Sequence, residues 1–502
     1  LRFKQPQLLA DRWLGVRSAT EWPPFCTQIN LKQYEYLTPI LNHNTTEDCL
    51  YLNIWTPVVA NTYETIDADN HNKSLAPVIV YIHGGVFVYM GTSFDIFNGG
   101  VVSGAGHVVF VTVNYRLGVF GFADTSGGER GGSDSNEGDG DENEEVSAAT
   151  NDEKDVPQNL GLYDIIMALT WIRDNIRQFG GDPNSVTLMG QSAGAISVGL
   201  LMASPLASHL FHRAILESSS PMQMNFFYQM SAPSFKRVLQ LTYCDHYNES
   251  VGEQIRCLRR LSTHELNSVH NVLMNNSFVS FSPSIPSVVL PDFPRDAFNP
   301  NIVDEPLGQK QILLGGNADE GTLFLHQIRP KQFSLDTDPN ITAADVRQIL
   351  REMATGLPEV SDRILDQIIG IKPTTGANIS AVELRQRLTT IIGDFLFKCP
   401  VVVFADALQE WPNGTDVYMY YFTQRSGRLP EWVGSSHFEE VQYVFGLPLR
   451  YPNDYDVEHR VFSLQLIKTW THFATTGKML PQMGINWPKY SSESGGQHMF
   501  LN

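Results

Sequence analysis

The sequence predicts an α/β fold with a large, mostly parallel central sheet and helices on both faces. Short apolar runs rich in β-branched and aromatic residues alternate with amphipathic stretches along most of the chain, which is typical of parallel sheets. With 502 residues, of which 42% are hydrophobic and 18% charged, the chain can bury a large core. It contains no internal repeat and no linker between two cores, so we expect a single domain over residues 1–502.

Five apolar runs bounded by Gly, Pro, Asn or Asp predict strands of that sheet: residues 77–85, 107–116, 185–190, 311–317 and 416–424. The segment over residues 161–180 predicts a helix instead. Its apolar residues recur at spacings of three and four, and it ends at Gly180-Gly181 as a helix C-terminus does. These residues are Leu162, Ile165, Ile166, Leu169, Ile172 and Ile176.

The formal net charge of −19 is concentrated in one segment. Residues 126–155 carry eleven acidic residues against Arg130 and Lys154, about −9 in a stretch rich in Gly, Ser and Asn. Such a composition cannot bury a core, so we expect a disordered acidic insertion at 126–155. The rest of the chain keeps a charge near −10, which would repel phosphates, and we therefore expect no nucleic-acid partner.

Cysteine usage and glycosylation sequons indicate an oxidising compartment. The chain has five cysteines and seven Asn-x-Ser/Thr sequons, so we expect a glycoprotein that is secreted or lies on the extracellular face of the plasma membrane. No run of 18 apolar residues is present, and a membrane anchor is not visible in this chain. The sequons are at Asn44, Asn72, Asn248, Asn275, Asn340, Asn378 and Asn413.

The stretch "SVTLMGQSAGAISVGLL" places a G-x-S-x-G motif between a predicted strand and a helix-like segment. A serine at the tip of such a turn needs small neighbours so that strand and helix can approach, and Gly190, Ala193 and Gly194 are small. The motif predicts that Ser192 is an exposed nucleophile. It also places the Ala193 N–H and the N-terminus of the helix where an oxyanion would form.

With "EDCLYLNIWTP", "VTVNYRLGVFGF", "GGNADEGTLFL" and "GSSHFEEVQYVFG" in the same order, the chain resembles the type-B carboxylesterase and cholinesterase family of α/β-hydrolases over nearly its whole length. The resemblance implies the α/β-hydrolase fold and a catalytic triad of Ser192, Glu320 and His437. The residues alone leave Asp319 open as the acid.

The family register and the short separations also imply two disulfides. We expect Cys26 to pair with Cys49 and Cys244 with Cys257, which leaves Cys399 unpaired within this chain.

Two of the departures from the family pattern lie in the motifs around the predicted nucleophile. Active members carry three consecutive glycines in the oxyanion loop, whereas this chain reads His83-Gly84-Gly85-Val86. The expected donors are then the amides of Gly85, Val86 and Ala193, and the β-branched Val86 crowds the oxyanion site and restricts the backbone. Gln191 also precedes the serine where most of the family has Glu.

The sequence therefore predicts a serine esterase without cofactor or metal, which acts through an acyl-enzyme on small or medium esters, at a rate reduced by Val86. The alternative is a non-catalytic adhesion or recognition ectodomain, neuroligin- or glutactin-like, and a protein partner or a homodimer stays open. The motif "GQSAG" also suits a juvenile-hormone-esterase-like enzyme. An acetylcholinesterase-like enzyme is a poorer fit, because Pro39 stands where cholinesterases have the tryptophan that stacks on choline.

Overall fold

A computed structural model describes most of the chain. The described residues are 2–9, 13–29, 44–57, 75–126, 156–245, 250–274, 279–303, 310–353, 360–371, 379–411, 415–482, 484–493 and 495–502. The predicted acidic insertion lies outside the described residues except for Ser126, whose hydroxyl donates to Asp124 Oδ1 at 2.6 Å.

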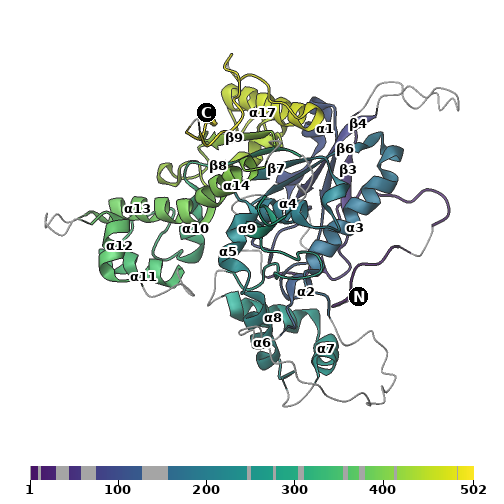
Figure 1. The fold of residues 1–502 in the computed structure, drawn as a ribbon, viewed down its shortest axis with the longest axis horizontal. Coiled ribbons are helices and arrows are strands. Elements are labelled where there is room, and N and C mark those ends of the chain that lie inside the picture. Colours follow the sequence, from purple (N-terminus) through teal and green to yellow (C-terminus); the bar gives the residue numbers. More distant parts are fainter. Residues whose placement is uncertain are drawn as a thin grey trace.

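The core is an eight-stranded sheet with the strand order β10–β9–β8–β7–β6–β4–β5–β3 (Figure 1). Neighbouring strands run parallel except β3, which pairs antiparallel with β5 at one edge. This confirms the predicted, mostly parallel sheet. The strands are β3 Leu52–Trp55, β4 Ala76–Ile82, β5 Val109–Val113, β6 Gly181–Gln191, β7 Arg213–Glu217, β8 Gln311–Asn317, β9 Val417–Phe422 and β10 Met499–Leu501, while β1 Phe25–Cys26 and β2 Thr45–Thr46 form a separate pair.

Helices cover both faces of the sheet. Thr187 Oγ1 on β6 donates to the Ala474 carbonyl of α17 at 3.3 Å, whereas a Cβ at Gly190 would lie 2.4 Å from the Gly194 backbone of α4. Because side chains alternate between the two faces of a strand, positions three apart point to opposite sides. Helices α17 (Val457–Thr476) and α4 (Ala193–Ala203) therefore lie on opposite faces.

The predicted helix over 161–180 is confirmed as α3 Leu160–Asn175, continued by a 3₁₀ turn over Ile176–Phe179 and ended by Gly180 at φ 79°. The other helices are α1 Gly100–Gly106, α2 Gly118–Phe122, α5 Met224–Phe227, α6 Ser231–Leu241, α7 Val251–Arg260, α8 Thr263–Met274, α9 Pro294–Ala297, α10 Glu320–Ile328, α11 Ala343–Met353, α12 Asp362–Ile369, α13 Ala381–Gly393, α14 Cys399–Gln409, α15 Glu439–Val444 and α16 Leu447–Arg450.

Helices α10 to α13 form a lobe beside the sheet, drawn in green at the left of Figure 1. The lobe has its own apolar cluster, which includes Phe333, Ile349, Leu365 and Leu388. The continuous helical stretch Ala381–Gln409 is long and apolar enough to cross a membrane, but 56% of its most apolar window is buried inside the protein. That burial is also what a core helix of a folded domain would show.

Candidate active site

The G-x-S-x-G motif forms a sharp turn between β6 and α4. Ser192 joins the two elements with φ 56° and ψ −124°, a backbone conformation that non-glycine residues rarely adopt. The close approach excludes side chains at both glycines. A Cβ at Gly190 would lie 2.4 Å from the Gly194 backbone, and one at Gly194 would lie 2.0 Å from the Ile82 carbonyl oxygen.

The backbone N–H of Ser192 donates to the carbonyl of Glu217, the last residue of β7, at 2.8 Å. This bond ties the turn to the neighbouring strand. The serine side chain is half-buried and lines a pocket together with His437. Among the described residues, Ser192 Oγ makes no hydrogen bond to the imidazole of His437.

Glu320 and His437 meet at the same edge of the sheet. Glu320 is fully buried at the start of α10, directly after β8, and its Oε2 lies 2.6 Å from His437 Nδ1. The second carboxylate oxygen, Oε1, accepts the backbone N–H of Asn317 at 2.7 Å. The ring centroid of Phe397 lies 4.4 Å from that of His437. The imidazole is thus held by a carboxylate on one side and an aromatic ring on another.

Asp319, which the residues alone left open as the acid, has a different contact. Its Oδ2 accepts the backbone N–H of Ser435 at 2.9 Å, and its own N–H donates to the Ser435 carbonyl at 2.9 Å. Asp319 therefore fixes the loop that carries His437, while Glu320 contacts the imidazole itself.

The predicted oxyanion loop, residues 83–87, follows β4 and packs on the serine turn. A Cβ at Gly84 would lie 3.0 Å from Ser192 Cβ. Gly85, Val86 and Phe87 have φ values of 94°, 53° and 62°, so three consecutive residues are left-handed. A β-branched residue is strained in that conformation. The predicted restriction of the backbone at Val86 thus takes the form of a strained turn.

The amides of Gly85 and Val86 donate to no acceptor among the described residues, and both residues line the pocket beside Ser192 and Ala193. The Ala193 N–H lies at the first position of α4, where helix amides have no partner within the helix. These three N–H groups are therefore available to a ligand oxygen.

His83, which precedes the glycines, is a buried structural residue. Its ring stacks on Tyr115 with centroids 4.5 Å apart, and the Tyr115 hydroxyl donates to the His83 carbonyl at 2.9 Å. Burial lowers the pKa of His83 to about 4, so its imidazole is neutral at physiological pH.

The pocket is small and uncharged. Its volume is about 50 Å³, and among the described residues that line it none is Asp, Glu, Lys or Arg. The walls away from Ser192 are mostly apolar side chains, which include Phe227, Val279, Leu323, Phe324 and Phe397. The lining residues there that carry polar groups are Tyr89, Gln223, Ser282 and Gln327. Such a cavity favours a small, neutral ligand.

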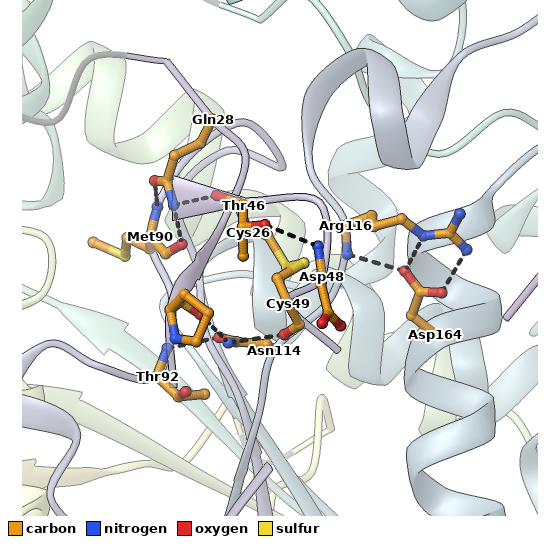
Figure 2. Close-up of a disulfide and its surroundings, with 11 residues drawn as sticks. Cys26, Gln28, Thr46, Asp48, Cys49, Met90, Thr92, Asn114, Arg116 and Asp164 are labelled. Atoms are coloured by element: carbon orange, nitrogen blue, oxygen red, sulfur yellow. Dashed lines mark hydrogen bonds and ion pairs between the residues drawn. A yellow bond between two sulfur atoms is a disulfide. The ribbon is translucent and has the colours of Figure 1, made fainter. Parts of the chain in front are cut away.

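Gln28, which lies two residues after Cys26 of the first disulfide, contacts the chain that follows the predicted oxyanion loop (Figure 2). Cys26 and Cys49 are joined, and Gln28 nearby bonds both the N–H and the carbonyl of Met90, at 2.8 and 2.9 Å. Asn114 accepts the N–H of Thr92 at 2.9 Å. Met90 lines the pocket, so these contacts fix one wall of the site.

The second disulfide joins Cys244, which follows α6, to Cys257 of α7, and Cys399 is free and exposed. All three cysteine assignments agree with the sequence prediction. Of the seven sequons, Asn44 and Asn340 are described, and both are exposed. The sequons at Asn72, Asn248, Asn275, Asn378 and Asn413 lie outside the described residues, as does Pro39.

Sequence analysis did not single out two buried carboxyl groups near the candidate site, those of Glu440 and Glu217. Glu440 is linked to Glu320 through Asn317, and Glu217 is near Glu440. Glu440 Oε2 accepts the side-chain amide of Asn317 at 2.5 Å, and its Oε1 accepts the Ser218 hydroxyl at 3.1 Å. Burial and then the nearby Glu320 carboxylate raise the pKa of Glu440 to about 7.

The other buried carboxyl group belongs to Glu217, whose Oε1 accepts the indole N–H of Trp470 at 2.8 Å. Burial and then the nearby Glu440 carboxylate raise the pKa of Glu217 well above its usual range. In the sequence, the burial of Glu217 is indicated only by its place at the end of an apolar, strand-like run, in "AILESSS".

The described residues contain no group of three or more His, Cys, Asp and Glu side chains that could hold a metal ion. The candidate site combines a serine in a strained turn, an imidazole bonded to a carboxylate, and three backbone N–H groups without an acceptor among the described residues. Together these groups can activate a hydroxyl and stabilise a developing oxyanion.

Comparison with known proteins places this geometry in context. The model of the carboxylesterase family matches residues 1–136 and 148–502. The chain is 31% identical to acetylcholinesterase-1 of Trittame loki, over 98% of this chain and 82% of that protein. It is 32% identical to a cholinesterase of Mus musculus (98% and 76%) and 30% identical to an acetylcholinesterase of Leptinotarsa decemlineata (100% and 76%).

Proposed function

Because the chain belongs to the carboxylesterase family, we propose that it is a serine carboxylic-ester hydrolase that forms an acyl-enzyme on Ser192. The observation that carries the proposal is that Ser192 and His437 line the same pocket. Ser192 lies there in its strained turn, and His437 lies there with Nδ1 2.6 Å from the buried Glu320 carboxylate.

In the proposed reaction, Ser192 Oγ attacks the ester carbonyl carbon while His437 Nε2 takes the hydroxyl proton. Glu320 keeps the other ring nitrogen protonated and stabilises the imidazolium. The amides of Gly85, Val86 and Ala193 bind the oxyanion. The imidazolium then protonates the departing alkoxide as the C–O bond breaks. In the second half, His437 activates water, which attacks the acyl carbon and releases the acid and the free serine.

The pocket supports small, uncharged esters as substrates. No carboxylate and no tryptophan is among its described lining residues, so a quaternary ammonium would find neither a counter-ion nor an indole face there. A volume of about 50 Å³ fits a short acyl chain, and longer chains would need the phenylalanine walls to move.

Val86 supports a slow rather than a fast enzyme. Its amide remains a donor, but the left-handed strain and the branched side chain limit how closely a carbonyl oxygen can approach. The same observation favours the competing function, a non-catalytic adhesion or recognition ectodomain in which a protein partner replaces the substrate.

One experiment separates the two functions. The purified glycoprotein is treated with a fluorophosphonate probe beside a Ser192→Ala variant of matched thermal stability. Labelling of the parent that is lost in Ser192→Ala supports the hydrolase. A folded parent that stays unlabelled supports the adhesion ectodomain.

The proposed extracellular location is supported by the disulfides and by exposed sequons. Two disulfides and the exposed sequons at Asn44 and Asn340 support secretion or display on the extracellular face of the plasma membrane. Digestion with a glycan-removing amidase should lower the apparent mass of the secreted protein, and an unchanged mass would remove the glycosylation part of this proposal.

A further inference from the structure

We propose that Gln191 is a positioning residue that occupies the free lone pair of His437 and so restrains the activation of Ser192. This inference rests on the proposed function, in which His437 is the base and Ser192 the nucleophile. It assigns a role to the last residue of β6, which directly precedes the serine.

The tautomer of His437 follows from its partner. Nδ1 lies 2.6 Å from Glu320 Oε2, and an ionised carboxylate can only accept, so Nδ1 carries the proton. In the neutral ring Nε2 is then the acceptor. This nitrogen must take the proton of the serine hydroxyl.

Gln191 contacts that same nitrogen. Its side-chain Nε2 lies 3.3 Å from His437 Nε2, and an amide nitrogen can only donate. The contact is therefore an N–H of Gln191 that points at the lone pair of the base. Among the described residues, no hydroxyl donates to this nitrogen, and Ser192 Oγ is not bonded to it.

Two donors cannot both align with a single lone pair, so Gln191 competes with Ser192. The distance of 3.3 Å lies slightly beyond the usual range of N–H donors and describes a weak bond, which the Ser192 hydroxyl can displace in the chemical step. A restraint of this strength slows the chemical step without abolishing it.

The packing of Gln191 keeps its carboxamide in this place. Only 1% of the residue is exposed, and a Cβ at Gly84 would lie 3.0 Å from Gln191 Oε1. The carboxamide is thus held between the oxyanion loop and the imidazole.

The test uses Gln191→Met, which keeps the length of the side chain but removes the donor. With a short-chain nitrophenyl ester, kcat should rise about 2- to 3-fold, the factor for a net hydrogen bond at the weak end of the usual range. KM should change less than about 2-fold, because the restraint acts on the base and not on substrate binding.

A second readout does not need ester hydrolysis. Diethyl pyrocarbonate attacks an unprotonated imidazole nitrogen, so peptide mapping of modified His437 measures how free Nε2 is. In a Ser192→Ala background, Gln191→Met should raise this modification rate by a similar factor. The matched control is Gln442→Met, since Gln442 is also buried near the His437 loop but bonds the Glu439 carbonyl and the Tyr455 hydroxyl, and it should leave both rates unchanged.

Faster modification together with a higher kcat supports the inference. Unchanged or slower modification of His437 in Gln191→Met overturns it, because the lone pair was then not occupied by Gln191. Faster modification without any fluorophosphonate labelling of Ser192 supports the Gln191 contact and refutes the proposed hydrolase.

Discussion

The side-chain amide of Asn317 donates to Glu440 Oε2 at 2.5 Å, and the backbone N–H of the same residue donates to Glu320 Oε1 at 2.7 Å. One asparagine thus links the carboxylate that holds His437 to a second, fully buried glutamate. The electrostatic environment of the candidate site therefore extends beyond the residues that line the pocket.

The titration of Glu440 should make stability depend on pH. Burial and the Glu320 carboxylate raise its pKa from 4.5 to about 7, so the folded chain binds this proton more tightly than the unfolded chain. The free energy of unfolding should then fall as pH rises from about 4.5 to about 7. Glu440→Gln removes the titration, and its unfolding free energy relative to the parent should rise between pH 5 and pH 8, by up to about 3 kcal/mol. Urea unfolding at both pH values measures this difference, and a difference independent of pH would contradict it.

Glu217 should be replaceable by its neutral isostere. Glu217→Gln keeps an acceptor for the Trp470 indole N–H and removes a buried carboxyl group whose pKa is raised by burial. We expect Glu217→Gln to stabilise the protein at pH 8 by about 1–2 kcal/mol. The effect should be smaller at pH 5, which lies close to the ordinary pKa of a glutamate, because ionisation of Glu217 in the unfolded chain favours unfolding less there.

The control for that prediction is Glu217→Ala, which also removes the acceptor and leaves a cavity, and which should destabilise at both pH values. Equal destabilisation by Gln at pH 5 and pH 8, measured by thermal unfolding, would show that ionised Glu217 is well accommodated.

Val86 should limit turnover. Val86→Gly removes the branched side chain and suits φ 53° without strain, so kcat should increase by about tenfold or more while KM changes less. Val86→Ala should give a smaller increase, because its Cβ remains. Steady-state kinetics with short-chain nitrophenyl esters provides the comparison. If all three proteins turn over at the same rate, the oxyanion loop does not limit the reaction.

The serine turn should not tolerate a methyl group at Gly194. The added Cβ would lie 2.0 Å from the Ile82 carbonyl oxygen, so Gly194→Ala must shift the backbone and should destabilise the fold by at least about 2 kcal/mol. Gly104→Ala is the matched control, since Gly104 is exposed in α1 and a Cβ there meets nothing within 4 Å. It should stabilise by about 0.5–1 kcal/mol. Similar melting temperatures for the two variants would contradict the close approach.

The sequence predicts the parts of this molecule that depend on local pattern. The apolar run over 311–317 became β8 with the same bounds, and the spacing of Gly190, Ser192 and Gly194 predicted a strand–turn–helix unit. Strand 185–190 was predicted too short, since β6 begins at Gly181. Its first residues are polar, and their pairing with β4 depends on a neighbour that no local pattern shows.

Long-range contacts within the candidate site could not be predicted from the sequence. Asp319 and Glu320 are adjacent, and only the direction of the chain at the start of α10 decides that Asp319 binds Ser435 while Glu320 binds His437. Gln191 and His437 are 246 positions apart, and nothing local relates them. The burial of Glu217 and Glu440 likewise follows from packing, because acidic residues are most often exposed.

The acyl-enzyme on Ser192 is tested most directly by a rapid-mixing experiment with a nitrophenyl acetate, followed by peptide mapping of the quenched protein. If Ser192 forms an acyl-enzyme, the protein should release an initial burst of nitrophenol of about one equivalent per chain and carry an acetyl group on Ser192, with neither in Ser192→Ala. A folded parent protein that gives no burst and no acetylated Ser192, even after Val86→Gly, would contradict the proposal that this chain is a serine esterase.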